Sequence, residues 1–225
     1  MKHFLSIDQG TTSSRAIIFN SNLEPILDAQ REYDLDYPND GWVELNPQDI
    51  LETVLASLEQ VLAEDIDIEA CGITNQRETT IVWSKSSGMP IYPGIVWQDR
   101  RTHEFCNELK LKGIEDSIKN KTGLVLDPYF SATKIKWILD NVEGAREKAE
   151  NGDLLFGTVD SYLIYMLSKE KNHFTDVTNA SRTLLFNIKT MEWDNELLDL
   201  FEIPRSMMPT VLSCDGDFGL ININN

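Results

Sequence analysis

The stretch Ser6–Asn20, SIDQGTTSSRAIIFN, decides the fold of this chain. Two runs rich in β-branched and other apolar residues, Lys2–Ile7 and Arg15–Asn20, predict a pair of strands. The loop between them, Asp8–Ser14, carries a carboxylate, a glycine and four hydroxyls. A hairpin needs only a turn residue or two, such as Asn-Gly. The loop therefore holds more polar chemistry than turning the chain requires, which indicates a ligand site.

The loop is suited to phosphate oxygens. Gly10 has no side chain, so the backbone can approach a ligand closely and can adopt a positive φ. Its N–H groups, with the hydroxyls of Thr11, Thr12 and Ser13, can cradle a phosphate. Neither a G-x-x-x-x-G-K-[ST] nor a G-x-G-x-x-G motif occurs in the chain, so no other phosphate-binding pattern competes.

Two charged residues flank the loop. Asp8, at the end of the first strand, can hold a Mg²⁺ through water, because Mg²⁺ favours a few carboxylates plus phosphates. Arg15, just beyond the loop, can neutralise charge on a transferring group. The alternative interpretation is a hairpin that carries polar side chains and binds no ligand.

The rest of the pattern predicts an α/β fold with a mixed sheet flanked by helices. A third strand is expected over Pro25–Tyr33, which gives a meander. Asn46-Pro47 then begins a helix whose apolar residues recur at helical spacing to Leu62. Two strands follow, over residues 69–76 and 79–85. A helix between strands is the α/β signature.

After Gly94 the pattern becomes mainly helical. The expected elements are helices at 100–113, 131–142, 145–150, 160–168 and 195–201, with strands at 154–159 and 183–188. Asp160 or Ser161 is expected to cap the fourth of these helices. The final LININN is uncapped and turn-like.

Composition excludes several classes of function. The net charge is −17, from 37 acidic and 20 basic residues, which argues against binding to nucleic acid or to an anionic membrane. Cys71, Cys106 and Cys214 are far apart and form no CxxC, so we expect reduced thiols, with Cys71 in a buried strand. The sequence contains no signal peptide and no run of membrane-spanning length, which predicts a cytoplasmic protein.

Three later stretches carry a resemblance. They are ITNQRETTIVW (Ile73–Trp83), GIVWQDRRT (Gly94–Thr102) and TGLVLDPYFSATKIKWILDN (Thr122–Asn141). With the first loop, they resemble the sugar-kinase family in order and spacing, and its glycerol-phosphorylating members most closely. GTVDSYLIYMLS and TDVTNASRTLLFNI extend the likeness to about Leu212.

The resemblance implies a ribonuclease H-like, actin-like ATPase fold. Residues 1–225 would form its N-terminal domain, and the C-terminal nucleotide-binding domain would be absent from this sequence. It also implies ATP and Mg²⁺ as cofactors and transfer of the γ-phosphoryl group to glycerol, giving glycerol 3-phosphate. Homo-oligomers are possible.

The same resemblance assigns site residues. Arg77, Glu78 and Tyr129 match glycerol-contacting positions, and Trp97 matches an apolar pocket wall. The nucleotide phosphates are expected at the loop, with Asp8 on the magnesium side; the loop positions are Gly10, Thr11, Thr12, Ser13 and Arg15. Arg77 and Glu78 also make chemical sense, since one donates and the other accepts from adjacent hydroxyls. A surface ion pair of little energetic value is the alternative.

The sequence departs from the family in one respect. The general base is expected in a Gly-Asp-Gln motif, and no such triplet occurs in residues 1–225. These residues should therefore carry the glycerol half-site and the phosphate loop but show little or no turnover alone. Three alternatives stay open: a kinase of another polyol or a pentulose, a non-catalytic binding module, and a ribonuclease H-like nuclease.

Overall fold

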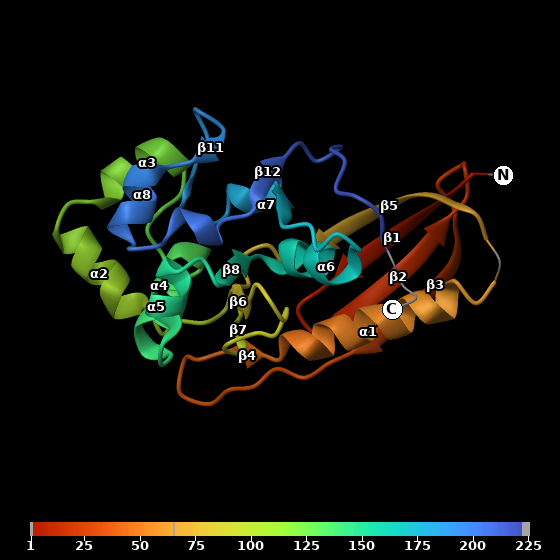
Figure 1. Cartoon of the computed structure of the whole chain (residues 1–225), viewed down its shortest axis with the longest axis horizontal. Helices are drawn as coiled ribbons and strands as arrows, with labels where there is room; N and C mark the ends of the chain where they lie inside the picture. Colours follow the sequence, from red (N-terminus) through yellow and green to blue (C-terminus); the bar gives the residue numbers. More distant parts are fainter. Residues whose placement is uncertain (1, 65, 222–225) are drawn as a thin grey trace.

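A four-stranded mixed sheet lies at one end of the computed structural model, which describes residues 2–64 and 66–221 (Figure 1). The strand order is β3-β2-β1-β5. Their bounds are His3–Gln9 for β1, Ser13–Phe19 for β2, Pro25–Glu32 for β3 and Ile68–Asn75 for β5. β1 is antiparallel to β2 and parallel to β5. The predicted meander and the mixed sheet are confirmed.

Helix α1, Pro47–Val61, packs against β2 and β3 and covers one face of the sheet (Figure 1). It begins as the sequence predicts: the Asn46 side chain accepts from Gln48 N at 3.1 Å, and proline occupies the first turn. Every second residue of β1 from Leu5 onward is buried, and Leu5 and Ile7 share a core with Ile50 and Leu58 of the helix. Apolar side chains that recur every two residues in the strand and every 3.6 residues in the helix face each other and form this core.

A second core lies at the other end of the molecule, among short helices (Figure 1). The helices are α2 (His103–Leu111), α3 (Glu115–Thr122), α4 (Ser131–Asn141), α5 (Ala145–Glu150) and α8 (Asn195–Leu200). Between the two ends lie the antiparallel pair β6 (Ile81–Ser84) and β8 (Leu154–Gly157), the pair β4 (Glu44–Leu45) and β7 (Gly94–Ile95), and α6 (Val159–Leu167). A Cβ on Gly157 would lie 2.8 Å from the Trp83 ring, so only glycine permits this packing.

The remaining elements are short. β9 (Phe174–Asp176) pairs in parallel with β12 (Thr210–Leu212), and β10 (Phe186–Asn187) pairs with β11 (Glu192–Trp193). α7 (Val177–Ala180) follows β9, and a 3₁₀ turn covers Arg205–Met207. None of the helices in the described ranges is both long and apolar enough to cross a membrane.

Several local expectations need correction. Cys71 lies in a strand, as predicted, but its side chain is exposed because it lines an open groove between β5 and α6. The helix expected from residue 160 begins at Val159 after Thr158, and Asp160 does not cap it: its carboxylate is buried and accepts from the hydroxyls of Thr158 and Thr175. Helix α3 was not predicted. The closing turn expected at 220–225 lies largely outside the described residues.

Candidate functional site

The loop between β1 and β2 is a tight turn in which Gly10 N donates to Ser13 O at 2.8 Å. Gly10 is not in the left-handed region, so the turn does not use the positive φ that glycine permits. A Cβ at this position would lie 3.4 Å from Ser13 O, so the glycine serves close packing. Because the Gly10 N–H already donates within the turn, a phosphate at this loop must bind to the N–H groups and hydroxyls of the residues after Gly10.

A buried polar cluster holds the loop from behind. The carbonyl oxygen of Gly10 accepts from Tyr33 Oη and Gln9 Nε2, both at 2.6 Å, and from Gln76 Nε2 at 3.1 Å. Burial raises the pKa of Tyr33 to about 12, so its hydroxyl remains a donor. No local pattern predicts this cluster, because its members come from three different segments.

Trp97 connects the loop to the predicted substrate residues. Its indole Nε1 donates to Thr11 Oγ1 at 3.0 Å, and its ring meets that of Tyr129 edge-on with centroids 5.6 Å apart. Both rings are half-buried. Thr11, Trp97 and Tyr129 therefore form a continuous line of contacts across three segments that are distant in sequence.

Glu78 extends that line. Its side chain is only 4 % exposed, and Oε1 accepts from Arg182 Nε at 2.6 Å. Lys134, fully buried, donates from Nζ to the main-chain oxygens of Glu78 and Tyr129, both at 2.8 Å. Arg182 and Lys134 were missed from the sequence, because neither belongs to a short pattern with the residues that it binds.

The other predicted residues lie at the edges of the line of contacts from Thr11 to Glu78. Asp8 and Thr12 are exposed, and Ser13 Oγ accepts from Gln30 Nε2 at 3.0 Å. Arg15 is turned toward β3, where its Nη2 donates to Asp28 Oδ2 at 2.9 Å. In this state Arg15 is engaged by a neighbouring strand rather than by the loop. Arg77 is exposed, next to buried Glu78.

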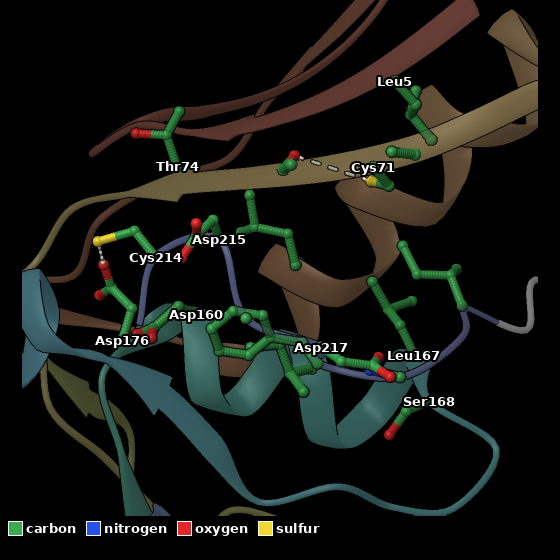
Figure 2. Close-up of a pocket in the computed structure, with 18 of the residues that line it drawn as sticks. Leu5, Cys71, Thr74, Asp160, Leu167, Ser168, Asp176, Cys214, Asp215 and Asp217 are labelled. Carbon is green, nitrogen blue, oxygen red and sulfur yellow. Dashed lines mark hydrogen bonds between the residues drawn. The ribbon is translucent and has the colours of Figure 1, made fainter. Parts of the chain in front are cut away.

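A groove of about 780 Å³ lies beside Arg77, between β5, α6 and the segment 214–221 (Figure 2). Among the predicted site residues, Arg77 alone lines it. Figure 2 shows Cys214 beside Asp176, where the thiol donates to Oδ2 at 2.9 Å. Within the described residues, no group of three or more His, Cys, Asp or Glu side chains could hold a metal ion.

Comparison with known proteins defines the class. Residues 3–225 match the model of the N-terminal domain of the FGGY family of carbohydrate kinases, and the chain belongs to that family. Proteins of this family are phosphotransferases, which agrees with the class expected from the sequence.

Individual relatives narrow the comparison. The chain is 57% identical over 225 residues to a glycerol kinase of Alteromonas mediterranea, covering 98% of this chain and 46% of the relative. It is 58% identical over 214 residues to a glycerol kinase of Oceanobacillus iheyensis, covering 93% and 43%. The chain thus spans less than half the length of these curated relatives.

The solved structures confirm the actin-like fold. The glycerol kinase of Plasmodium falciparum, determined with ADP, matches with a TM-score of 0.95 at 34% identity, over 99% of this chain and 45% of that one. A gluconate kinase of Lactobacillus acidophilus matches with a TM-score of 0.85 at 24% identity, over 94% and 42%, and supports the fold alone.

Proposed function

We propose that residues 1–225 form the glycerol-binding and phosphate-binding half of an ATP-dependent glycerol kinase, which converts glycerol to glycerol 3-phosphate. The observation that carries the proposal is the line of contacts from Thr11 through Trp97 and Tyr129 to Glu78. A phosphate loop and a set of hydroxyl-binding side chains adjoin there, as phosphoryl transfer between two bound substrates requires.

On the glycerol side, a triol needs donors and acceptors held rigidly against an apolar wall. Glu78 supplies carboxylate oxygens in a position shielded from water, and exposed Arg77 supplies donors beside it. Tyr129 supplies a hydroxyl: burial, and then the charge of Glu78, raises the pKa of Tyr129, so this group stays protonated. The Trp97 ring is the apolar wall.

On the nucleotide side, we assign the phosphate oxygens of ATP to Thr11, Thr12 and Ser13. Arg15 would have to leave Asp28 in order to reach them, which a half-exposed ion pair permits at little cost. Asp8 is a single exposed carboxylate at the end of β1, so a Mg²⁺ there would be bound mainly by water and phosphate oxygens. That arrangement suits a metal ion that arrives with the nucleotide.

Glycerol binding by this chain is the test of the proposal. We expect the indole signal of Trp97 to shift saturably in an NMR titration with glycerol. Arg77→Ala should abolish the shift, while Arg31→Ala, whose exposed side chain binds Gln60 of α1, should leave it unchanged. The absence of a shift in the parent chain would contradict the glycerol half-site. A larger response to xylulose would reassign the substrate.

Phosphoryl transfer by residues 1–225 alone should be slow. The described site holds no carboxylate that would face a glycerol hydroxyl other than Glu78, whose charge is already neutralised by Arg182. A missing general base costs about 10²–10⁴ in rate. A coupled ADP-release assay should therefore give at most about 1% of an ordinary kinase rate of 1–100 s⁻¹. Ordinary rates would show that the base lies within residues 1–225.

A further inference from the structure

Arg182 binds the carboxylate of Glu78 but is not one of the residues to which the proposed function assigns a contact with glycerol or phosphate. It follows α7, in a turn that two hydrogen bonds hold in place. Ala132 N donates to Thr183 O at 2.9 Å, and Asn75 Nδ2 donates to Asn179 Oδ1 at 3.1 Å. The first contact reaches the start of α4, and the second reaches the end of β5. The guanidinium is thus presented by a turn that is anchored to both segments bordering the site.

The guanidinium is also confined by aromatic rings. Its central carbon lies 5.0 Å from the ring centroid of Phe130 and 5.7 Å from that of Tyr129. A cation over such rings is attracted by their electron-rich faces, and more strongly where water is excluded. Nε then meets Glu78 Oε1 at 2.6 Å, a charge-assisted bond. The geometry determines both the place and the direction of this contact.

We propose that Arg182 is a positioning residue of the glycerol site: it supplies the counter-charge of the Glu78 carboxylate and fixes Oε1, so that Oε2 is directed to a substrate hydroxyl. This inference rests on the proposed function. It concerns the carboxylate and assigns Arg182 no contact with the reacting atoms. The consequence is that Glu78 accepts a hydrogen bond from the substrate hydroxyl, which keeps its proton.

Three groups face Glu78 from the elements packed around it. Arg182 reaches its carboxylate, Tyr129 lies within reach of its charge, and Lys134 is bound to its main-chain oxygen. Burial lowers the pKa of Lys134 to about 7, so this amine is only partly charged at neutral pH. Arg182 is accordingly the permanent counter-charge. Without it, a carboxylate that is 4 % exposed takes up a proton more readily and loses an acceptor.

The experiment compares the parent chain with Arg182→Met, Arg182→Lys and a control, Arg146→Met, which removes an ion pair on the surface near α5. Glycerol affinity is measured from the Trp97 indole signal. A lost charge-assisted hydrogen bond predicts that Arg182→Met binds glycerol about tenfold or more weakly. Its affinity should fall further as the pH is lowered from about 7.5 to about 6.

Arg182→Lys keeps the charge, so it should restore most of the affinity and the flat pH profile. Arg146→Met should match the parent. The proposal is overturned if Arg182→Met binds as tightly as the parent, or if the Met and Lys variants are equally weak with flat pH profiles, because the role of Arg182 would then be structural only.

A second readout needs no ligand and separates this inference from the proposed function. The ¹³C signal of the Glu78 carboxyl group reports its protonation in the free chain. We expect it to take up its proton at a higher pH in Arg182→Met than in Arg182→Lys. If the parent shows no glycerol response, the proposed function fails, and this comparison decides alone whether Arg182 controls the charge of Glu78. Identical titrations in the two variants would refute that control.

Discussion

Replacing Arg101 by methionine is expected to lower the free energy of unfolding by about 3–5 kcal/mol, the usual cost of leaving buried charges without their partner. The Arg101 side chain is completely buried. Its Nη2 donates to Glu44 Oε1 at 2.7 Å and to Asp99 Oδ2 at 2.8 Å. The substitution leaves both carboxylates in the interior without a cation. Urea denaturation of the parent and the variant measures the difference.

Packing adds to this effect. The guanidinium carbon lies 3.9 Å from the ring centroid of Trp42 and 4.5 Å from that of Trp137, so the cation is enclosed between two indoles. Asp99 also accepts from Val43 N at 2.7 Å, and Val96 N donates to Val43 O at 3.0 Å. Loss of the cation should therefore loosen the turn that contains Trp97, and the indole signal of Trp97 should broaden in the variant.

The neighbouring arginine is a matched control. Arg100 pairs with Asp127, but its side chain is 47% exposed, so Arg100→Met should cost less than about 1 kcal/mol. Equal losses in the two variants would contradict the role assigned to Arg101. An unchanged free energy of unfolding in Arg101→Met would show that the two carboxylates are protonated or hydrated in the folded chain.

These two arginines also show where sequence reasoning ends. In the run QDRR, Arg100 and Arg101 look alike, and nothing in the local pattern says which one is buried. Their difference is produced by Glu44, Trp42 and Trp137, which lie far along the chain. Period and composition predict whether a segment forms a strand or a helix, but a buried polar network depends on the tertiary fold.

The fold was predictable where the pattern was long. The strands β1 and β2 alternate buried and open residues, and α1 has an asparagine cap, a proline and a helical apolar stripe. Short elements were missed or shortened. The predicted strand at 183–188 is reduced to β10. The three-residue strands β9 and β12 pair with each other although α7, β10, β11 and α8 lie between them in the sequence, so neither carries a local signal.

The candidate site divides in the same way. The Asp8–Ser14 loop and the Arg77-Glu78 pair follow strands, and this placement is typical of ligand sites in α/β folds, so the sequence alone predicts them as site positions. Arg182 is 104 residues away from the carboxylate that it binds, and Lys134 is 56 residues away from the Glu78 oxygen that it binds. Spacing in sequence carries no information about such contacts.

Lys134→Met should lower the free energy of unfolding by about 2–4 kcal/mol, because two buried carbonyl oxygens lose a donor. Those oxygens belong to Glu78 and Tyr129, so the variant should also weaken glycerol binding. Lys136→Met, two residues further along α4, is the control. Lys136 binds the more exposed carboxylates of Asp140 and Glu202, and its loss should cost less than about 1 kcal/mol.

The stability of the parent chain should depend on pH through the same amine. Burial lowers the pKa of Lys134 from 10.5 to about 7, although the nearby charges of Asp99 and Glu78 raise it. Between these two pH values the unfolded chain binds a proton that the folded chain does not, so the free energy of unfolding rises with pH. Below about pH 7 both states are protonated, and this contribution no longer changes.

The difference in unfolding free energy between the parent and Lys134→Met isolates that contribution, because the other titrating groups are common to both chains. We expect the difference to widen from about pH 7 to about pH 9, with a slope that approaches about 1.4 kcal/mol per pH unit for one proton. The neutral amine still has two N–H groups, so both carbonyl oxygens remain satisfied as the charge is lost. A difference independent of pH would mean that the folded chain keeps Lys134 charged. Lys134 would then share with Arg182 the neutralisation of Glu78, and the pH profile expected for Arg182→Met would be correspondingly shallower.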